Sequence, residues 1–129
     1  MKRKLFFSLG LMIALTGIII LNSCQKEISC DCLDTKQPPV AKAGIDQIIT
    51  LPTDSVTLSG SASNDPDGSI TTFIWAKISG PASLSVANPG SAITKIKNLV
   101  VGVYNFELKV TDNDGLSAKD TVQITKWCK

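Results

Sequence analysis

The chain has 129 residues, of which 43% are hydrophobic, 5% aromatic and 19% charged, and its formal net charge is +2. Three of the 13 basic residues are Lys2, Arg3 and Lys4, and the rest of the chain carries ten lysines, no arginine and 11 acidic residues. This near-neutral balance argues against a nucleic-acid partner, which needs a basic stripe. The chain also has no histidine and no serine in a Gly-x-Ser-x-Gly motif, so we expect no enzymatic activity.

The basic start is followed by an apolar run, Leu5–Leu21, and then by Asn22, Ser23 and Cys24. A positive segment, an apolar segment and a small residue at the cleavage site mark a secretory signal. Residues 1–23 resemble a bacterial lipoprotein signal peptide, in which Cys24 becomes the lipidated first residue. A membrane-spanning helix is the alternative, since about 17 apolar residues is the short end of the spanning range. The prediction is an exported lipoprotein of the outer membrane or cell envelope, in either leaflet, with the membrane as partner through its lipid anchor.

Residues 24–37 are polar, show no strand or helix period, and lead into a proline pair that favours extended backbone. This composition predicts a short tether. The first four residues of the tether, Cys24 to Glu27, resemble the charged export signals of some Bacteroidota surface lipoproteins.

Residues 38–127 form the predicted globular domain, which is all-β and long enough for one core. The clearest strand is Val103–Thr111, where apolar and polar residues alternate. Alternation with period 2 places the apolar set on the core and the polar set in water. Asp112–Gly115 has hairpin turn chemistry and leads to a second alternating run, Lys119–Lys126, so these two strands should pair.

Five more strands are predicted upstream, separated by Gly and Pro residues. Thr72–Ile78 is apolar on both faces, which is typical of a central strand. About seven short strands at this spacing predict a β-sandwich. The other four are Gln47–Leu51, Ser55–Ser59, Ser83–Val86 and Ala92–Lys97.

An ordered series of short motifs runs along residues 38–126. Its members are Pro39, Val40, Ala41, Ala43, Gly44, Asp46, Gln47, Val56, Leu58, Gly60, Ser61, Asp65, Pro66, Asp67, Gly68, Trp75, Lys77, Ser79, Gly80, Pro81, Gly102, Tyr104, Phe106, Val110, Thr111 and Asp112. The series resembles the PKD (polycystic kidney disease) domain family. The stretch from Trp75 to Pro81 departs from the usual family signature and is similar to PKD-like modules attached to bacterial surface proteins and polysaccharide-degrading enzymes. The resemblance implies an immunoglobulin-like sandwich that acts as a spacer or adhesion module without catalytic residues.

Three aromatic residues have predicted places in such a sandwich. Trp75 should lie in the core, and Tyr104 should form a tyrosine corner. Because side chains alternate along a strand, Trp127 should point outward on the same face as Thr125 of the last strand. An exposed aromatic ring can stack on a sugar or anchor a protein, so Trp127 is the candidate contact residue for a polysaccharide or protein ligand.

Two acidic loops should meet at one end of this topology. One loop holds Asn64, Asp65 and Asp67, and the other holds Asp112 and Asp114. Ca²⁺ favours six to eight such oxygen ligands, and the family resemblance implies calcium in some members. The alternative is turn formation alone, since Asp-Pro-Asp-Gly also suits a tight turn.

Lipidation of Cys24 leaves Cys30, Cys32 and Cys128 as disulfide candidates in an exported protein. Cys30 and Cys32 are too close in sequence for an unstrained bridge, which favours one of them pairing with Cys128. The remaining thiol is either free or joined to another chain, and a metal site built from the three cysteines is the weaker alternative because of their spacing.

These observations predict a lipoprotein with one PKD-like domain that works as a non-catalytic adhesion or polysaccharide- or protein-contact module. The alternative is a structural spacer or envelope component that contacts another protein.

Overall fold

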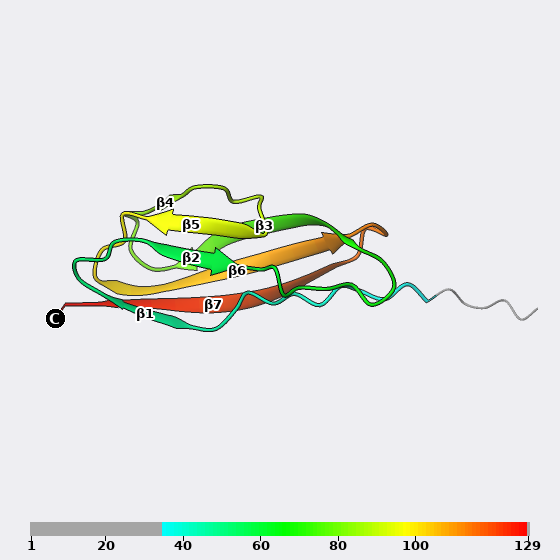
Figure 1. Cartoon of the computed structure of the whole chain (residues 1–129), viewed down its shortest axis with the longest axis horizontal. Coiled ribbons are helices and arrows are strands. Elements are labelled where there is room, and N and C mark those ends of the chain that lie inside the picture. Colours follow the sequence, from blue (N-terminus) through cyan, green and yellow to red (C-terminus); the bar gives the residue numbers. More distant parts are fainter. Residues whose placement is uncertain (1–34, 129) are drawn as a thin grey trace, which may run out of the picture. The chain divides into compact units, whose positions relative to one another are not determined.

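The computed structural model describes residues 35–128 (Figure 1). The chain divides into two compact units, Met1–Asp34 and Thr35–Lys129, and the second contains every described strand. In the described part of the chain no helix is long and apolar enough to cross a membrane. The strands are β1 (Gln47–Thr50), β2 (Val56–Ser59), β3 (Ile70–Ser79), β4 (Ser85–Val86), β5 (Ile93–Lys97), β6 (Gly102–Asp112) and β7 (Ser117–Trp127).

The seven strands form two sheets, one in the order β1-β7-β6-β3 and the other in the order β2-β5-β4. Strands β6 and β7 are joined by the predicted hairpin and pair over ten residues. The β1–β7 pair is the one parallel pair among the strand pairs of the described residues. Figure 1 shows β1 running along β7 toward the end where the chain reaches Cys128. The predicted immunoglobulin-like sandwich is therefore confirmed.

The core lies between the two sheets and is built on the alternation of β6. The side chains of Tyr104, Phe106, Leu108 and Val110 are completely buried, as their spacing predicts. Leu58 and Ile96 face them from the three-stranded sheet, and Trp75 and Ile124 complete the core from β3 and β7. Burying a large apolar side chain contributes about 1.5 to 3 kcal/mol, so β6 carries much of the stability of the fold.

Strand β3 differs from its prediction, because it lies at the edge of the four-stranded sheet and not at its centre. The apolar residues on its outer face are exposed, at 47% for Ile74 and 55% for Ile78, and are not covered by a second layer. The Trp75 amide instead donates to the Pro89 carbonyl oxygen at 2.8 Å, so the loop that precedes β5 covers part of this edge. Strand β4 is also shorter than predicted, at two residues.

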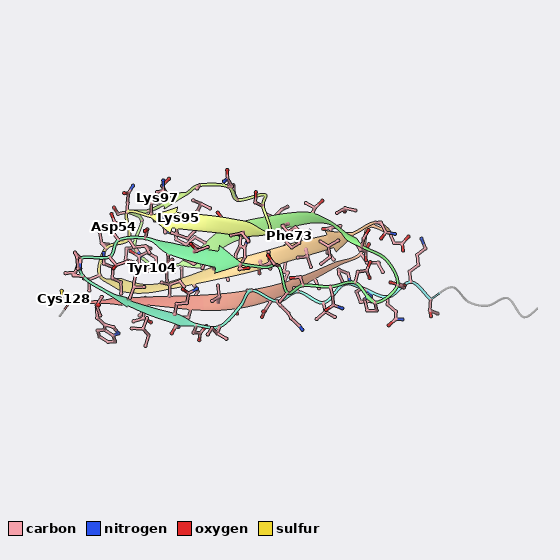
Figure 2. The ribbon with its side chains drawn as sticks, in the orientation of Figure 1. Asp54, Phe73, Lys95, Lys97, Tyr104 and Cys128 are labelled. Carbon is pink, nitrogen blue, oxygen red and sulfur yellow. The ribbon has the colours of Figure 1, made fainter. Side chains whose placement is uncertain are left out.

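The loop between β5 and β6 is held from inside the sandwich. The Tyr104 hydroxyl donates to the Val100 carbonyl oxygen and accepts from the Val100 amide, both at 2.9 Å, which confirms the tyrosine corner. Lys126 is 3% exposed, and its ammonium donates to the Leu99 carbonyl oxygen at 2.6 Å. Figure 2 shows Tyr104 toward the end of the sandwich that carries Cys128.

Candidate functional site

The two acidic loops lie at the same end of the sandwich, as the sequence predicts. The Asn113 amide donates to the Ser69 carbonyl oxygen at 3.0 Å, and the Ser69 amide donates to Asn113 Oδ1 at 2.7 Å. These two bonds join the loop before β3 to the β6–β7 hairpin. We call the region around them, with Asp65, Asp67 and Asp112, the acidic end.

Asp112 is the most buried member of the acidic end, with 3% of its surface exposed. It continues the inward parity of β6, and its Oδ1 accepts hydrogen bonds from the amides of Asp114 at 2.8 Å and Leu116 at 2.9 Å. Its Oδ2 is buried without a hydrogen-bond partner among the described residues. A buried carboxylate oxygen in this state is costly, so the site suits an added cation or water.

Asp65 lies in the same environment. Both of its carboxylate oxygens are buried and unpartnered in the described part of the chain. Burial raises the pKa of Asp65 above its ordinary value, and the neighbouring charges of Asp67 and Asp112 raise it further. The surroundings of Asp65 therefore disfavour the charged form of its side chain.

A glycine makes room for two oxygen atoms at this end. A Cβ atom added to Gly68 would lie 2.2 Å from Asn113 Oδ1 and 2.6 Å from Asp65 Oδ2. The two oxygens therefore converge on the bare Cα of Gly68, in a space that any other residue would fill. The sequence analysis treated Gly68 only as part of a tight turn and not as a site residue.

The other predicted calcium ligands have partners elsewhere. Asp67 Oδ2 accepts a hydrogen bond of 2.7 Å from the Gln37 amide, which lowers the pKa of Asp67. Asp114 forms an ion pair with Lys36, and Asn64 exchanges backbone hydrogen bonds with Val40. Within residues 35–128 no three His, Cys, Asp or Glu side chains are grouped to hold a metal ion. The unpartnered carboxylate oxygens of this end belong to Asp65 and Asp112, and the Asn113 amide oxygen lies beside Asp65 at Gly68.

The second candidate site is on the outer face of the four-stranded sheet, at the end away from the acidic loops. Here Val103 lies opposite Thr125, which in turn lies beside Ile48. In the next row Trp127 lies beside Thr50, and the β6–β7 register, extended by one residue, places Val101 on its other side. We call this set the Trp127 surface: Ile48, Thr50, Val101, Val103, Thr125 and Trp127.

The Trp127 surface is apolar and carries no charged side chain. Ile48 is 72% exposed and Trp127 is 56% exposed, which agrees with the outward parity predicted for Trp127. Contiguous exposed apolar side chains of this kind mark contact sites in soluble proteins. The sequence analysis identified Trp127 and missed its aliphatic neighbours, because they come from β1, from β6 and from the loop before β6.

A polar row borders the Trp127 surface and separates it from the charged part of the sheet. The backbone amide of Gln123 donates to Asp46 Oδ1 at 2.8 Å, and the side-chain Nδ2 of Asn105 donates to Ser79 Oγ at 2.8 Å. Beyond this row lies the ion pair of Lys119 with Glu107. The polar row and the ion pair therefore bound the Trp127 surface on the side toward the acidic end.

The predicted cysteine sites fall partly outside the described residues. Cys24, the lipidation candidate, and Cys30 and Cys32, two of the disulfide candidates, lie in residues 1–34. Cys128 is exposed and is a free cysteine within residues 35–128. It follows Trp127 directly, and Figure 2 shows it at the end of β7.

Comparison with known proteins agrees with this fold. The chain is 38% identical over 91 residues to the human Dyslexia-associated protein KIAA0319, in a match that covers 70% of this chain and 8% of that protein, so the chain spans a small part of that relative. The PKD domain from KIAA 1837 protein superposes with a TM-score of 0.65 at 37% identity, over 69% of this chain and 86% of that one. A structure titled for the promiscuous specificity of carbohydrate-binding modules from the β-sandwich superfamily superposes with a TM-score of 0.53 at 28% identity, over 72% of this chain and 36% of that one.

A family model described as "K319L-like, PKD domain" matches residues 43–125, which include all seven strands apart from the last residues of β7. The sandwich, its tyrosine corner and this match agree on one assignment. The chain belongs to the K319L-like PKD domain family.

Proposed function

We propose that this protein is a non-catalytic contact module and that its Trp127 surface is the part that binds. The observation that carries the proposal is the contiguous exposed set in which Ile48, Val101 and Val103 flank Trp127. Aromatic side chains are enriched at contact sites because one end packs and the other remains wet. The domain behind the surface is a packed sandwich, which would hold these side chains in place before a ligand arrives.

The neighbours of Trp127 favour a protein ligand over a polysaccharide. Three of the five other residues of this surface, Ile48, Val101 and Val103, provide aliphatic contact area, and the remaining two, Thr50 and Thr125, each offer one hydroxyl group. A sugar would need more hydrogen-bonding groups beside the stacking ring, because leaving its hydroxyl groups unpaired is costly. A polysaccharide is the second candidate, supported by the exposed indole and by the fold shared with a carbohydrate-binding module.

We further propose that the domain is displayed on a cell surface or in the envelope by a lipid on Cys24. The described chain begins next to the acidic end, where Lys36 pairs with Asp114, and the Trp127 surface lies at the other end of β7. A spacer role is the competing proposal, and it requires no ligand at this surface.

Calcium at the acidic end is a separate proposal, supported by the unpartnered oxygens of Asp65 and Asp112. These two carboxylates and Asn113 Oδ1 would hold the ion, and water would complete its shell, since Ca²⁺ prefers six to eight oxygens. Bound calcium would neutralise the buried carboxylates of Asp65 and Asp112. Its role would be structural, joining the loop before β3 to the β6–β7 hairpin.

The contact proposal is tested by retention of the unit Thr35–Lys129 on insoluble polysaccharides and on immobilised envelope proteins, in calcium and in chelator. Trp127→Ala is compared with Ile74→Ala, a matched control on the same sheet face outside the Trp127 surface. Retention that is lost in Trp127→Ala and kept in Ile74→Ala supports the proposal. Equal retention of the two variants, or no retention of the parent on either material, favours the spacer.

A further inference from the structure

We propose that the outer face of the three-stranded sheet binds an acidic polysaccharide, a sugar polymer that carries carboxylate or sulfate groups. This inference goes beyond the proposed function, because it concerns the other sheet and holds whether or not the Trp127 surface binds a ligand. The face consists of the residues of β2, β4 and β5 that point away from the core. We call it the Lys95 surface: Thr57, Ser59, Ser85, Ile93, Lys95 and Lys97.

The pairing of the strands places the two lysines of this surface in its middle. Strand β5 is the central strand of its sheet, and Lys95 and Lys97 point to the same side of it, with about 6.6 Å between their Cα atoms. Thr57 lies opposite Lys95 on β2, and Ser85 lies opposite Lys97 on β4. All four residues are exposed. The lysines are thus flanked by short side chains that leave their ammonium groups accessible.

The ammonium groups of Lys95 and Lys97 have no hydrogen-bond or ion-pair partner within residues 35–128. Other lysines of the domain are engaged: Lys36 and Lys119 form ion pairs, and Lys126 donates to a carbonyl oxygen. Binding of an anion to the Lys95 surface therefore breaks no existing ion pair of the domain.

The chain around the Lys95 surface also lacks opposing charge. Between Asp67 and Glu107 the sequence has no acidic residue, and this stretch includes β3, β4 and β5. Strand β2 has no acidic residue either. Asp54, in the loop before β2, forms an ion pair with neither lysine of the surface. The three-stranded sheet therefore carries positive charge alone.

Positive and negative charges are separated along the domain. Figure 2 shows Lys95 and Lys97 toward the end of the sandwich that carries Cys128. The acidic end lies beside the β6–β7 hairpin, at the opposite end of β7. A charge distribution of this kind attracts an anionic ligand to one end of a protein and repels it from the other. Charge complementarity thus directs an acidic polymer to the Lys95 surface.

The hydroxyl groups of the Lys95 surface favour a sugar polymer over an anionic membrane. Thr57, Ser59 and Ser85 can each donate to and accept from sugar hydroxyl groups. Juxtamembrane segments that bind anionic lipids use clusters of about four to eight basic residues. The Lys95 surface has two lysines and no aromatic side chain. A polymer that repeats its acidic group can bind several such domains at once, which compensates for the few charges on each.

The Lys95 surface and the Trp127 surface lie on the outer faces of different sheets and suit different ligands. The Trp127 surface is apolar and uncharged, whereas the Lys95 surface offers ammonium and hydroxyl groups. One domain would therefore be able to hold an acidic polysaccharide on one face and a protein on the other.

The experiment measures the dissociation constant of the unit Thr35–Lys129, which contains every described strand and the described core, on polygalacturonate, dextran sulfate and uncharged dextran. The test variant combines Lys95→Gln with Lys97→Gln. The matched control combines Lys42→Gln with Lys109→Gln, which removes the same charge from lysines outside the three-stranded sheet. Thermal unfolding checks that both variants are folded.

We expect the parent to bind polygalacturonate, dextran sulfate or both, and not dextran; the polymer that binds identifies carboxylate or sulfate as the group recognised. The Lys95→Gln, Lys97→Gln variant should bind about tenfold more weakly, and the control should stay within about twofold of the parent. Raising the salt concentration from about 0.01 M to about 0.15 M should weaken binding by the parent, because the screening length falls from about 30 Å to about 8 Å.

The variant Thr57→Val with Ser85→Ala tests the hydroxyl groups without changing charge. It should weaken binding about threefold and leave the salt dependence as it is in the parent. Affinity equal to that of the parent would show attraction by charge alone and would overturn the assignment of a sugar-binding face.

Three other results would also overturn the inference. One is an equal loss of affinity in the lysine variant and its control, since net charge would then explain the binding. Another is binding of the parent to phosphatidylglycerol vesicles and to neither acidic polymer, which would favour a membrane partner. The third is loss of polymer binding in Trp127→Ala, which would move the site to the Trp127 surface. Failure of the Trp127 surface to bind any ligand would leave the inference intact.

Discussion

The Tyr104 hydroxyl satisfies both backbone groups of Val100, accepting from its amide and donating to its carbonyl oxygen, each at 2.9 Å. One side-chain oxygen thus closes the loop that enters β6. The ring of Tyr104 is completely buried beside Phe106, with 6.4 Å between ring centroids. The loop and the core are therefore tied to one residue.

Tyr104→Phe should lower the free energy of unfolding by about 1 to 3 kcal/mol, because it keeps the ring and leaves two backbone groups without a partner. Denaturant unfolding measures this loss of free energy. The slope of the unfolding free energy against denaturant concentration should equal that of the parent. A stability equal to that of the parent would show that water replaces the hydroxyl.

Gly80→Ala should destabilise the fold by at least about 2 kcal/mol. Gly80 has a φ of +114°, and an added Cβ atom would lie 2.7 Å from the Val103 carbonyl oxygen. Gly115→Ala is the matched control, since its φ is +86° and no atom lies within 4 Å of the added Cβ. The control should lose about 1 to 2 kcal/mol, the cost of the left-handed conformation alone. Thermal unfolding ranks the two variants, and equal losses would contradict the close approach at Gly80.

The two tryptophans should respond differently to replacement by Phe. Trp75 is 3% exposed and donates from Nε1 to the Ser91 carbonyl oxygen at 3.1 Å. Trp75→Phe should cost about 2 to 4 kcal/mol, from lost packing and an unpaired carbonyl. Trp127→Phe should change stability by less than about 0.5 kcal/mol, as is usual for exposed sites. Chemical denaturation of both variants checks the contrast, and a large loss in Trp127→Phe would place its indole in the core.

Asp65→Asn should stabilise the protein in the presence of a chelator at neutral pH. The folded-state pKa of Asp65 is raised, so protonation favours the folded state, and the ionised form opposes folding as pH rises through that pKa. The neutral amide avoids this cost. The free energy of unfolding of Asp65→Asn should therefore exceed that of the parent only slightly below the ordinary pKa of 3.8, and the difference should grow as pH rises toward 7. Unfolding curves across this range measure it, and an advantage that shrinks with rising pH would contradict the assigned direction.

Calcium should raise the melting temperature of the parent and have little effect on Asp65→Asn or Asp112→Asn, if these carboxylates hold the ion. Asp46→Asn is a control acidic residue, because Asp46 lies beside Gln123 and not at the acidic end. Equal calcium responses in all four proteins would rule out the acidic end as the binding site.

The sequence predicts the parts of this fold that depend on strict alternation. The β6 run from Tyr104 to Val110 and the hairpin to β7 follow from period 2 and turn chemistry alone. The position of β3 could not be inferred in this way, because exposed apolar residues such as Ile74 and Ile78 resemble those of a strand covered on both faces.

The same limit applies to polar residues on inward positions. Lys126 and Asp112 share the inward parity of their strands, yet both carry charges that composition assigns to solvent. Their burial depends on backbone partners that alternation does not reveal: the distant Leu99 carbonyl oxygen for the lysine, and the amides of the adjoining hairpin for the aspartate. The Trp127 surface likewise exists only once β1, β6 and β7 are placed side by side.

The parallel pairing of β1 with β7 determines how the domain would respond to pulling. The first and last strands run in the same direction, so a force applied at Thr35 and at Cys128 draws them past each other. The hydrogen bonds of the pair, from Gln47 beside Ile124 to Thr50 beside Trp127, then carry load together in shear and do not open one at a time. Force spectroscopy through these two ends should record a higher unfolding force than pulling through Gly102 and Cys128, at the adjacent ends of β6 and β7, where the hydrogen bonds of the pair break in succession. A protein fixed at one end and engaged at the other would in this way bear tension along its strongest direction.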